Sequence, residues 1–261
     1  MTDILAQIVD SRRRDYAVPA VPMAELRAMC RDRTDFRPFR EALRKKASKP
    51  GVAAVIAEIK RGSPSKGMFA PNLDPVLCAA EYETGGAACL SVLTEPKYFF
   101  GTLGDLTAAR QNTVLPVLRK DFIVSEYQVY ETALYADCML LIARSLEAAQ
   151  LKDLYSLAAE LQLDVLVEVC DEADIEKIAP FRFPLVGINH RNLATMDVDM
   201  TRSQRLAEAF TPEQHLVAAS GIFSRDGIDR AMSSGITSFL IGESLSRKTD
   251  RAAFLRELTG E

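Results

Sequence analysis

The sequence predicts an α/β fold, a (β/α)8 TIM barrel with an N-terminal helical extension. From about residue 52 onward, short apolar runs alternate with longer segments of helical pattern, and strict alternation of this kind implies a parallel sheet. The pattern repeats eight times, which favours closure into a barrel over an open doubly wound sheet. No G-x-G-x-x-G follows the first apolar run, which argues against a dinucleotide-binding sheet.

The extension comes first along the chain, at residues 1–50, and is mostly helical in pattern. Ile4, Leu5, Ile8 and Val9 form an apolar stripe at helical spacing, and further helices are expected near 23–30 and 36–46. We expect these helices to pack against the barrel and to cover one of its mouths. No long linker separates them from the repeats, so residues 1–261 are expected to form a single domain.

The repeats follow in order. Short apolar runs predict strands at 53–59, 89–93, 115–118, 138–142, 165–169, 185–188, 216–219 and 238–241. Segments of helical pattern predict helices at 75–82, 103–110, 126–135, 146–161, 172–178, 201–210, 225–232 and 251–258. Serine or aspartate stands where a helix N-cap is expected at Ser125, Ser145, Ser224 and Asp250.

The composition is typical of a globular protein with a full core, since 48% of the 261 residues are hydrophobic and 26% are charged. The net charge of −4 argues against nucleic acid as a partner. No apolar run approaches the roughly 18 residues that span a bilayer, and no signal peptide opens the chain. We therefore expect a cytoplasmic protein with no membrane partner. The five cysteines show no metal-ligand spacing and are expected to be buried free thiols in a reducing compartment.

The end of the first predicted strand carries two charged side chains. Glu58 and Lys60 are two residues apart, so both point to the same face of the strand. A loop rich in glycine, serine and lysine follows directly and contains Ser63. A carboxylate and an ammonium in this position indicate acid/base chemistry beside an anion site. A surface ion pair at a strand end is the alternative, and this segment alone does not exclude it.

Matching groups stand at the ends of other predicted strands. Strand 3 ends with Lys120, strand 5 contains Glu168 within an apolar run, and strand 7 ends at Ser220. Alternate strands of such a barrel contribute side chains to one layer at its carboxyl end, so these groups are expected to meet Glu58 and Lys60. Two carboxylates and two lysines can compensate one another's charge. A purely structural ion-pair network is the alternative interpretation.

The last strand ends predict an anion site. Gly221 follows strand 7, and Gly242 and Glu243 follow strand 8. In barrels of this kind the last two loops and a short helix start bind phosphate through backbone N–H groups. These residues, with Ser63, are therefore expected to bind phosphate, and the expected partner is a phosphorylated small molecule.

Aromatic and apolar residues in the loops predict a pocket for a flat ring. Phe99 lies in a loop with consecutive aromatics, and Phe122, Leu193 and Met196 stand at other strand ends. The alternative is that the loop packs on the barrel rim through its own aromatics. Asn189 and Arg191 are expected to point together into the same region, because they are two residues apart.

Neither histidine is expected to be catalytic. His190 alternates with its neighbours and should point away from them, and His215 stands at the opposite end of strand 7. No metal triad is evident, so no metal and no cofactor are expected.

Six segments, in order along nearly the whole chain, resemble the indole-3-glycerol phosphate synthase family. They are EIKRGSPSKG at 58–67, SVLTEPKYF at 91–99, KDFI at 120–123, LVEV at 166–169, GINHRNL at 187–193 and SGI at 220–222. The resemblance implies a cofactor-independent carbon–carbon lyase of tryptophan biosynthesis. Its substrate would be 1-(2-carboxyphenylamino)-1-deoxyribulose 5-phosphate, and its products indole-3-glycerol phosphate, CO₂ and water.

The resemblance also implies roles for the residues that match. Lys120 would be the general acid that protonates the ketone as the anthranilate ring carbon attacks, with Glu168 as its acid/base partner. Glu58 and Lys60 would assist the later dehydration and orient the substrate. The roles of positioning polar groups and of holding the closing intermediate would fall to Asn189, Arg191 and Ser220. How the proton transfers divide between the lysines and glutamates stays open.

One position departs from the family. The family usually has glutamate immediately before the Ser-Gly of strand 7, where this chain has Ala219. The departure motivates an alternative, a weakly active or non-catalytic paralogue that binds a related phosphorylated aromatic ligand. A phosphosugar isomerase is a further rival, but it would need a different acid/base pair. The expected assembly is a monomer or a weak homo-oligomer.

Overall fold

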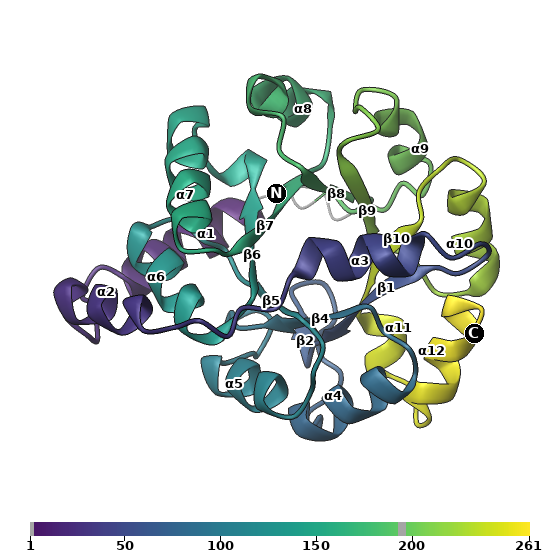
Figure 1. Cartoon of the computed structure of the whole chain (residues 1–261), viewed down its shortest axis with the longest axis horizontal. Helices are drawn as coiled ribbons and strands as arrows, with labels where there is room; N and C mark the ends of the chain where they lie inside the picture. Colours follow the sequence, from purple (N-terminus) through teal and green to yellow (C-terminus); the bar gives the residue numbers. More distant parts are fainter. Residues whose placement is uncertain (1–2, 193–196) are drawn as a thin grey trace.

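The computed structural model, which describes residues 3–192 and 197–261, contains a closed barrel of eight parallel strands (Figure 1). Each strand is hydrogen-bonded to the next in chain order, and the last pairs with the first. The predicted (β/α)8 barrel is therefore confirmed. The barrel strands are β1 (Ala54–Ile59), β4 (Cys89–Leu93), β5 (Val117–Lys120), β6 (Cys138–Ile142), β7 (Asp164–Val169), β8 (Leu185–Asn189), β9 (His215–Ala219) and β10 (Ser238–Ile241).

A helix follows each barrel strand and packs on the outside. These helices are α4 (Pro75–Thr84), α5 (Leu103–Gln111), α6 (Glu126–Tyr135), α7 (Ala148–Glu160), α8 (Glu172–Ile178), α9 (Arg202–Ala207), α10 (Arg225–Met232) and α12 (Arg251–Thr259). Shorter elements interrupt the alternation: the hairpin of β2 (Gly62–Ser63) and β3 (Gly67–Met68), α11 (Glu243–Ser246), and the 3₁₀ turns η1 (Ala143–Ser145) and η2 (Ala179–Phe181).

Two boundaries differ from the prediction for clear reasons. The strand β5 runs two residues later than 115–118, because Arg119 and Lys120 remain in the sheet although their side chains are charged. The prediction that Ser145 caps the following helix is wrong, since this serine ends the turn η1 and the helix begins at Ala148. The caps at Ser224 and Asp250 are confirmed, each accepting a backbone hydrogen bond from its own first turn.

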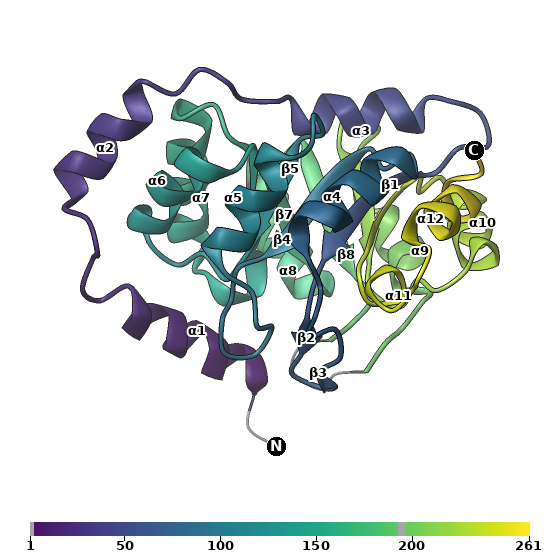
Figure 2. The same cartoon turned by 90° about the horizontal axis from the view of Figure 1, so that it is seen from below.

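The N-terminal extension reaches both ends of the barrel. It consists of α1 (Ile4–Asp15), α2 (Met23–Arg31) and α3 (Phe39–Ala47). Figure 2 shows α1 beside the hairpin that follows β1 and α3 at the opposite end, joined by the segment that carries α2. Phe39 and Leu43 of α3 are completely buried under the amino ends of the strands. The expectation that the extension covers one mouth is thus too narrow, because it contacts both.

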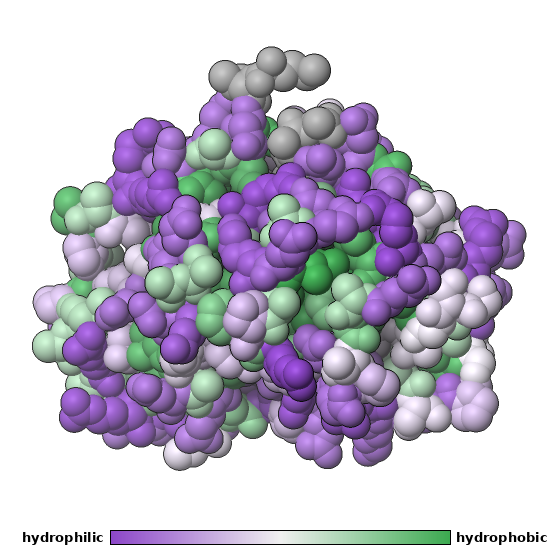
Figure 3. All heavy atoms as spheres, turned by 90° about the horizontal axis from the view of Figure 1, so that it is seen from above, coloured by the Kyte–Doolittle hydropathy of each residue, from purple (hydrophilic) through white to green (hydrophobic). Residues whose placement is uncertain are grey.

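Apolar side chains fill the barrel and the layer between barrel and helices. The face of the molecule seen in Figure 3 is largely hydrophilic, with apolar groups between the polar ones. All five cysteines are buried and none forms a disulfide, as predicted. Of the helices that the structure describes, none combines the length and apolar character needed to cross a membrane.

The base of the barrel holds a histidine that resists protonation. His215 begins β9, and its Nε2 lies 2.7 Å from Ser238 Oγ. Burial, together with the charges of Arg44 and Arg40, lowers the pKa of His215 from 6.5 to about 4. Below pH 6.5 the unfolded chain therefore binds a proton at this position, while the folded protein does so only near pH 4.

We expect this difference to make the protein less stable as the pH falls from 7 to 5. In His215→Gln the acid-sensitive group is gone, so its free energy of unfolding should fall by about 2 kcal/mol less over this interval than that of the wild type. Urea unfolding of both proteins at the two pH values measures the difference. If the free energy of unfolding falls equally in the two proteins, the low pKa of His215 in the folded state is wrong.

Candidate active site

A pocket opens at the carboxyl ends of the barrel strands, with about 1070 Å³ of space, part of it open to solvent. Every predicted site residue in the described part of the chain lines it: Glu58, Lys60, Ser63, Phe99, Lys120, Phe122, Glu168, Asn189, Arg191, Ser220, Gly221, Gly242 and Glu243. Leu193 and Met196, predicted to contribute to the ring pocket, lie outside the described residues. The structure thus brings together groups that are up to 185 positions apart (58 to 243).

Two lysine–carboxylate pairs form the centre of the pocket. Lys60 Nζ lies 2.6 Å from Glu58 Oε1, and Lys120 Nζ lies 2.7 Å from Glu168 Oε2. Both glutamates are 3% exposed. A carboxylate so deeply buried is costly unless it is paired, and each is paired with a lysine. The second oxygen of Glu168 accepts a 3.0 Å hydrogen bond from Asn189 Nδ2.

The strand pattern explains why these side chains converge. Successive residues of a strand point to opposite faces, so Glu58 and Lys60 both point inward while Ile59 packs outward among the helices. In the same way Lys120 enters the pocket, while the side chain of its neighbour Arg119 lies buried on the other face of β5. One pair therefore joins residues two positions apart at the end of β1, and the other joins residues of β5 and β7.

One side of the pocket is suited to an anion. The short helix α11 starts directly after β10, with Gly242 as its N-cap, so first-turn N–H groups lie at the pocket wall. Gly242 is packed so closely against the Glu58–Lys60 pair that a Cβ atom would clash with the carboxylate and lie 2.9 Å from Lys60 Nζ. The Glu243 carboxylate pairs with Lys66 and Arg247, so main-chain groups rather than this side chain suit an anion.

The chain makes an unusual turn after β9, at the side of the pocket that is suited to an anion. Ser220 and Gly221 adopt left-handed φ angles of 71° and 75° in succession, and such a conformation is strained for serine. His190 holds the turn, because its Nδ1 lies 2.9 Å from the Ser220 carbonyl oxygen. Its Nε2 lies 2.8 Å from Ser203 Oγ. As expected, His190 points away from the pocket.

The opposite side of the pocket is apolar. The rings of Phe99 and Phe122 lie 5.9 Å apart between centroids. Ile4, Leu5 and Ile8 of α1 line the same pocket, a contribution that the sequence reasoning missed. Their apolar stripe indicated packing, but nothing in the sequence showed that the surface packed against it was the pocket. This side can accommodate a flat ring.

Ala219 lies at the pocket wall and is 4% exposed. It pairs in register with Asn189 of β8 and with Leu240 of β10. Among the described residues, no group of three or more histidine, cysteine or acidic side chains could hold a metal ion. The two lysine–carboxylate pairs are suited to proton transfer, and they lie between a side of the pocket suited to an anion and a side suited to a ring.

Comparison with known proteins gives a consistent result. The family model described as indole-3-glycerol phosphate synthase matches residues 5–258. A protein of that name from Desulfosudis oleivorans is 51% identical over 261 residues, which cover 99% of each chain. Proteins of the same name from Polaromonas naphthalenivorans and Laribacter hongkongensis are each 43% identical, covering 100% and 99% of both chains, respectively.

The contacts of His190 predict its tautomer. A carbonyl oxygen can only accept, so Nδ1 must carry the proton, and the neutral ring then accepts from the Ser203 hydroxyl at Nε2. Burial lowers the pKa of His190 below 6.5. We expect ¹⁵N NMR of the ring to show the neutral Nδ1–H form, titrating below 6.5.

The chain has two histidines, so the His215→Gln variant leaves one ring signal and makes the assignment direct. An Nε2–H tautomer, or a titration above 6.5, would show that His190 does not hold the Ser220 carbonyl in solution.

Proposed function

Because the chain belongs to the indole-3-glycerol phosphate synthase family, we propose that this pocket closes the indole ring of its substrate. The substrate is 1-(2-carboxyphenylamino)-1-deoxyribulose 5-phosphate, and the products are indole-3-glycerol phosphate, CO₂ and water. The protein is a carboxy-lyase of tryptophan biosynthesis. The observation that supports this most strongly is the pair of buried lysine–carboxylate contacts between an anion-binding side and an apolar side.

Lys120 acts first in the proposed mechanism. The ring carbon that bears the carboxylate attacks the ketone carbon, and the Lys120 ammonium gives a proton to the ketone oxygen as the new carbon–carbon bond forms. Glu168, 2.7 Å from Lys120 Nζ, holds this group in place in the pocket. A positioned general acid of this kind contributes roughly 10²- to 10⁴-fold in rate.

Decarboxylation and dehydration follow. The carboxylate leaves as CO₂ and its electron pair returns to the ring. The hydroxyl formed from the ketone then takes up a proton and leaves as water, and the neighbouring CH₂ carbon, which is bonded to the nitrogen, gives up a proton as the new double bond forms. Lys60 and Glu58 are placed to assist this loss, because they lie 2.6 Å apart beside Gly242 at the anion side. Asn189 and Arg191 position the polar groups of the substrate between the two sides.

The substrate spans the pocket from one side to the other. Its phosphate lies against the main chain of Gly221 and Gly242, with Ser63 of the hairpin above. Its aromatic ring packs against the side of the pocket formed by Phe99 and Phe122. The Ser220 hydroxyl faces the closing ring. In this arrangement the ketone is placed near the two lysines.

The enzyme is proposed to act in the cytoplasm as a single domain of 261 residues, monomeric or weakly associated, without nucleic acid or membrane partners. The net charge of −4 supports the absence of nucleic acid. A non-catalytic paralogue is less favoured, since both lysine–carboxylate pairs are intact despite Ala219.

Incubation of the purified protein with the carboxyphenylamino-deoxyribulose phosphate tests this function. The chain has no tryptophan, so indole fluorescence reports product without a tryptophan background from the protein. We expect turnover. Tight phosphate-dependent binding without turnover would instead identify the paralogue, and neither binding nor turnover would reject the assignment of this substrate.

Lys120→Ala and Glu168→Gln should each remove most turnover, because one lacks the proposed acid and the other lacks the charge that directs it. Glu168→Gln should change thermal unfolding little, because the amide keeps the shape of the side chain and Lys120 is partly exposed. Lys120→Ala leaves the buried Glu168 without its cation, so it should also lower the unfolding midpoint. The comparison of kcat with the unfolding midpoint decides between a catalytic and a structural role. A large loss of stability with normal turnover of the folded fraction would support a structural ion-pair network.

Ala219→Glu should raise kcat/KM, because it restores a carboxylate next to Asn189 at the pocket wall. Ala219→Gln is the matched control, as it adds the same bulk without the charge. Steady-state kinetics of the two variants against the wild type measure the effect. Equal rates for Ala219→Glu and the wild type would show that the missing carboxylate is not needed here.

A further inference from the structure

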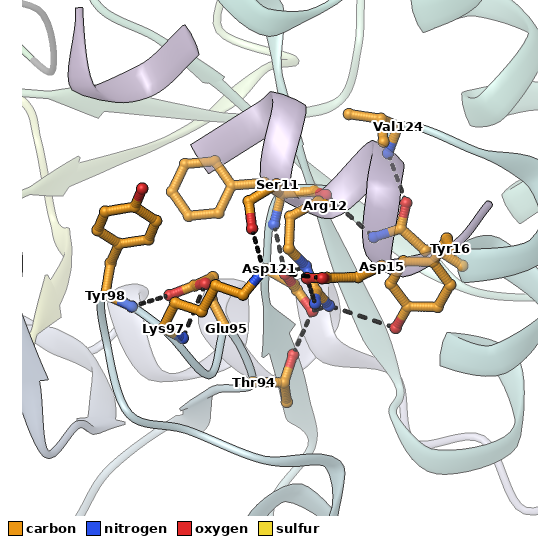
Figure 4. Close-up of polar contacts among 12 residues, drawn as sticks. Ser11, Arg12, Asp15, Tyr16, Thr94, Glu95, Lys97, Tyr98, Asp121 and Val124 are labelled. Carbon is orange, nitrogen blue, oxygen red and sulfur yellow. Dashed lines mark hydrogen bonds and ion pairs between the residues drawn. The ribbon is translucent and has the colours of Figure 1, made fainter. Parts of the chain in front are cut away.

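The face of α1 that packs on the barrel changes in character along the helix. In its first turns Ile4, Leu5 and Ile8 line the pocket. One turn further along the same face stands Arg12, which is 4% exposed although it is charged. Figure 4 shows this polar part of α1, with Ser11, Arg12 and Asp15, beside Thr94 and Asp121, which follow β4 and β5. A buried arginine in an extension that precedes the barrel needs a strong partner there.

That partner is Asp121. Arg12 Nε lies 3.0 Å from Asp121 Oδ1, and Arg12 Nη2 lies 2.7 Å from Asp121 Oδ2. This forked, two-bond geometry fixes the relative orientation of the two side chains as well as their distance. The two residues are 109 positions apart in the chain, and Asp121 is 1% exposed.

Asp121 is itself held from several directions. It accepts hydrogen bonds from Thr94 Oγ1 at 2.6 Å, from Arg119 Nη2 at 3.0 Å and from the Phe122 backbone N–H at 2.8 Å. Burial alone would raise the pKa of Asp121, but the charges of Arg119 and Arg12 outweigh it and lower the pKa below its usual value. The carboxylate is therefore ionised and directed at α1.

Asp121 is joined directly to two residues of the proposed site. It stands between Lys120 and Phe122, and all three residues line the pocket. Asp121 follows the last residue of β5, and its carboxylate is buried against Arg12 and Arg119. Whatever fixes Asp121 therefore fixes the main chain from which the lysine projects.

A second contact joins α1 to the loop that presents Phe99. Lys97 Nζ lies 2.6 Å from Ser11 Oγ and 3.0 Å from Asp15 Oδ1. The buried Glu95 shapes this loop, accepting backbone hydrogen bonds from Lys97, Tyr98 and Phe99 (Figure 4). The polar part of α1 thus contacts the segments that follow β4 and β5. These segments carry Phe99 and Phe122, the two phenylalanines at the apolar side of the pocket.

We propose that Arg12 is a positioning residue of the active site. Through its forked pair with Asp121 it holds α1 over the pocket and, by the same contact, fixes the strand end that bears Lys120 and Phe122. The inference deepens the proposed function and rests on it. A merely structural role for the same pair would affect stability and leave the kinetics of the folded enzyme unchanged.

The principal experiment compares Arg12→Met with the exposed neighbour Arg13→Ala in the full-length protein. Arg13 pairs only at the surface, with Asp10 at 3.3 Å and 56% of its own side chain exposed. Arg119 still compensates Asp121 in Arg12→Met, so the barrel should fold. We expect kcat/KM to fall at least about tenfold in Arg12→Met, with part of the loss in kcat, and to stay within about twofold of the wild type in Arg13→Ala.

Arg12→Lys and Asp121→Asn complete the test. Arg12→Lys keeps the charge without the fork and should recover part of the lost activity, and it replaces Arg12→Met if that variant does not fold. The double variant of Arg12→Met with Asp121→Asn should lose no more activity than the worse of the two single variants, because both act through one contact. Independent, multiplying losses would overturn the inference.

Hydrogen exchange supplies a readout that does not depend on turnover. In Arg12→Met the amides of α1 should exchange faster while the barrel strands keep their protection. Wild-type kcat and KM in a folded Arg12→Met with a mobile α1 would overturn the inference. If the wild type itself shows no turnover, the proposed function fails. The affinity for the same substrate then replaces the kinetics, and equal affinity in Arg12→Met and wild type overturns the inference.

Discussion

Charge compensation inside a closed barrel is the constraint on which the rest of this structure depends. A carboxylate that points into such a barrel has little water around it, so it stays ionised only beside a cation. Glu58 and Glu168 each meet that need with a lysine less than 3 Å away. The same arrangement holds the two lysines in the pocket, where a general acid is useful. Stability of the strand ends and reactivity of the pocket thus have one physical origin.

A second layer of compensation lies behind the strands. Arg119 is completely buried between the barrel and its helices, and its guanidinium reaches Thr94, Asp121 and Glu131. The Arg119 side chain does not line the pocket, yet Arg119 is the residue next to Lys120 in β5. Because residues of a strand alternate between faces, a polar cluster outside the barrel and an acid inside it share one stretch of main chain. The extension joins this cluster through α1.

Prediction from the sequence succeeded where a feature depends on a single strand or on the order of elements. The spacing of Glu58 and Lys60 alone places both side chains on one face, and the alternation of strands and helices was enough to predict a closed barrel. Prediction was less accurate where a feature depends on contacts with other segments of the chain. Ser145 has the residue type of a cap but ends a 3₁₀ turn, and β5 continues through Arg119 because its charge is compensated within the fold. The extension was expected at one mouth, and it contacts both because α1 and α3 are separated by the long segment that carries α2.

The sequence by itself determined the barrel, the family and the residue types that gather at its mouth, because strand periodicity and motif spacing are local properties of the chain. Only the tertiary structure gave the distances within the two lysine–glutamate pairs, and showed that Asn189 holds the second oxygen of Glu168. It alone placed Ile4, Leu5 and Ile8 in the pocket and paired Arg12 with Asp121, 109 positions away. Such contacts depend on how helices and loops pack against the closed sheet, and no local pattern encodes a partner that distant.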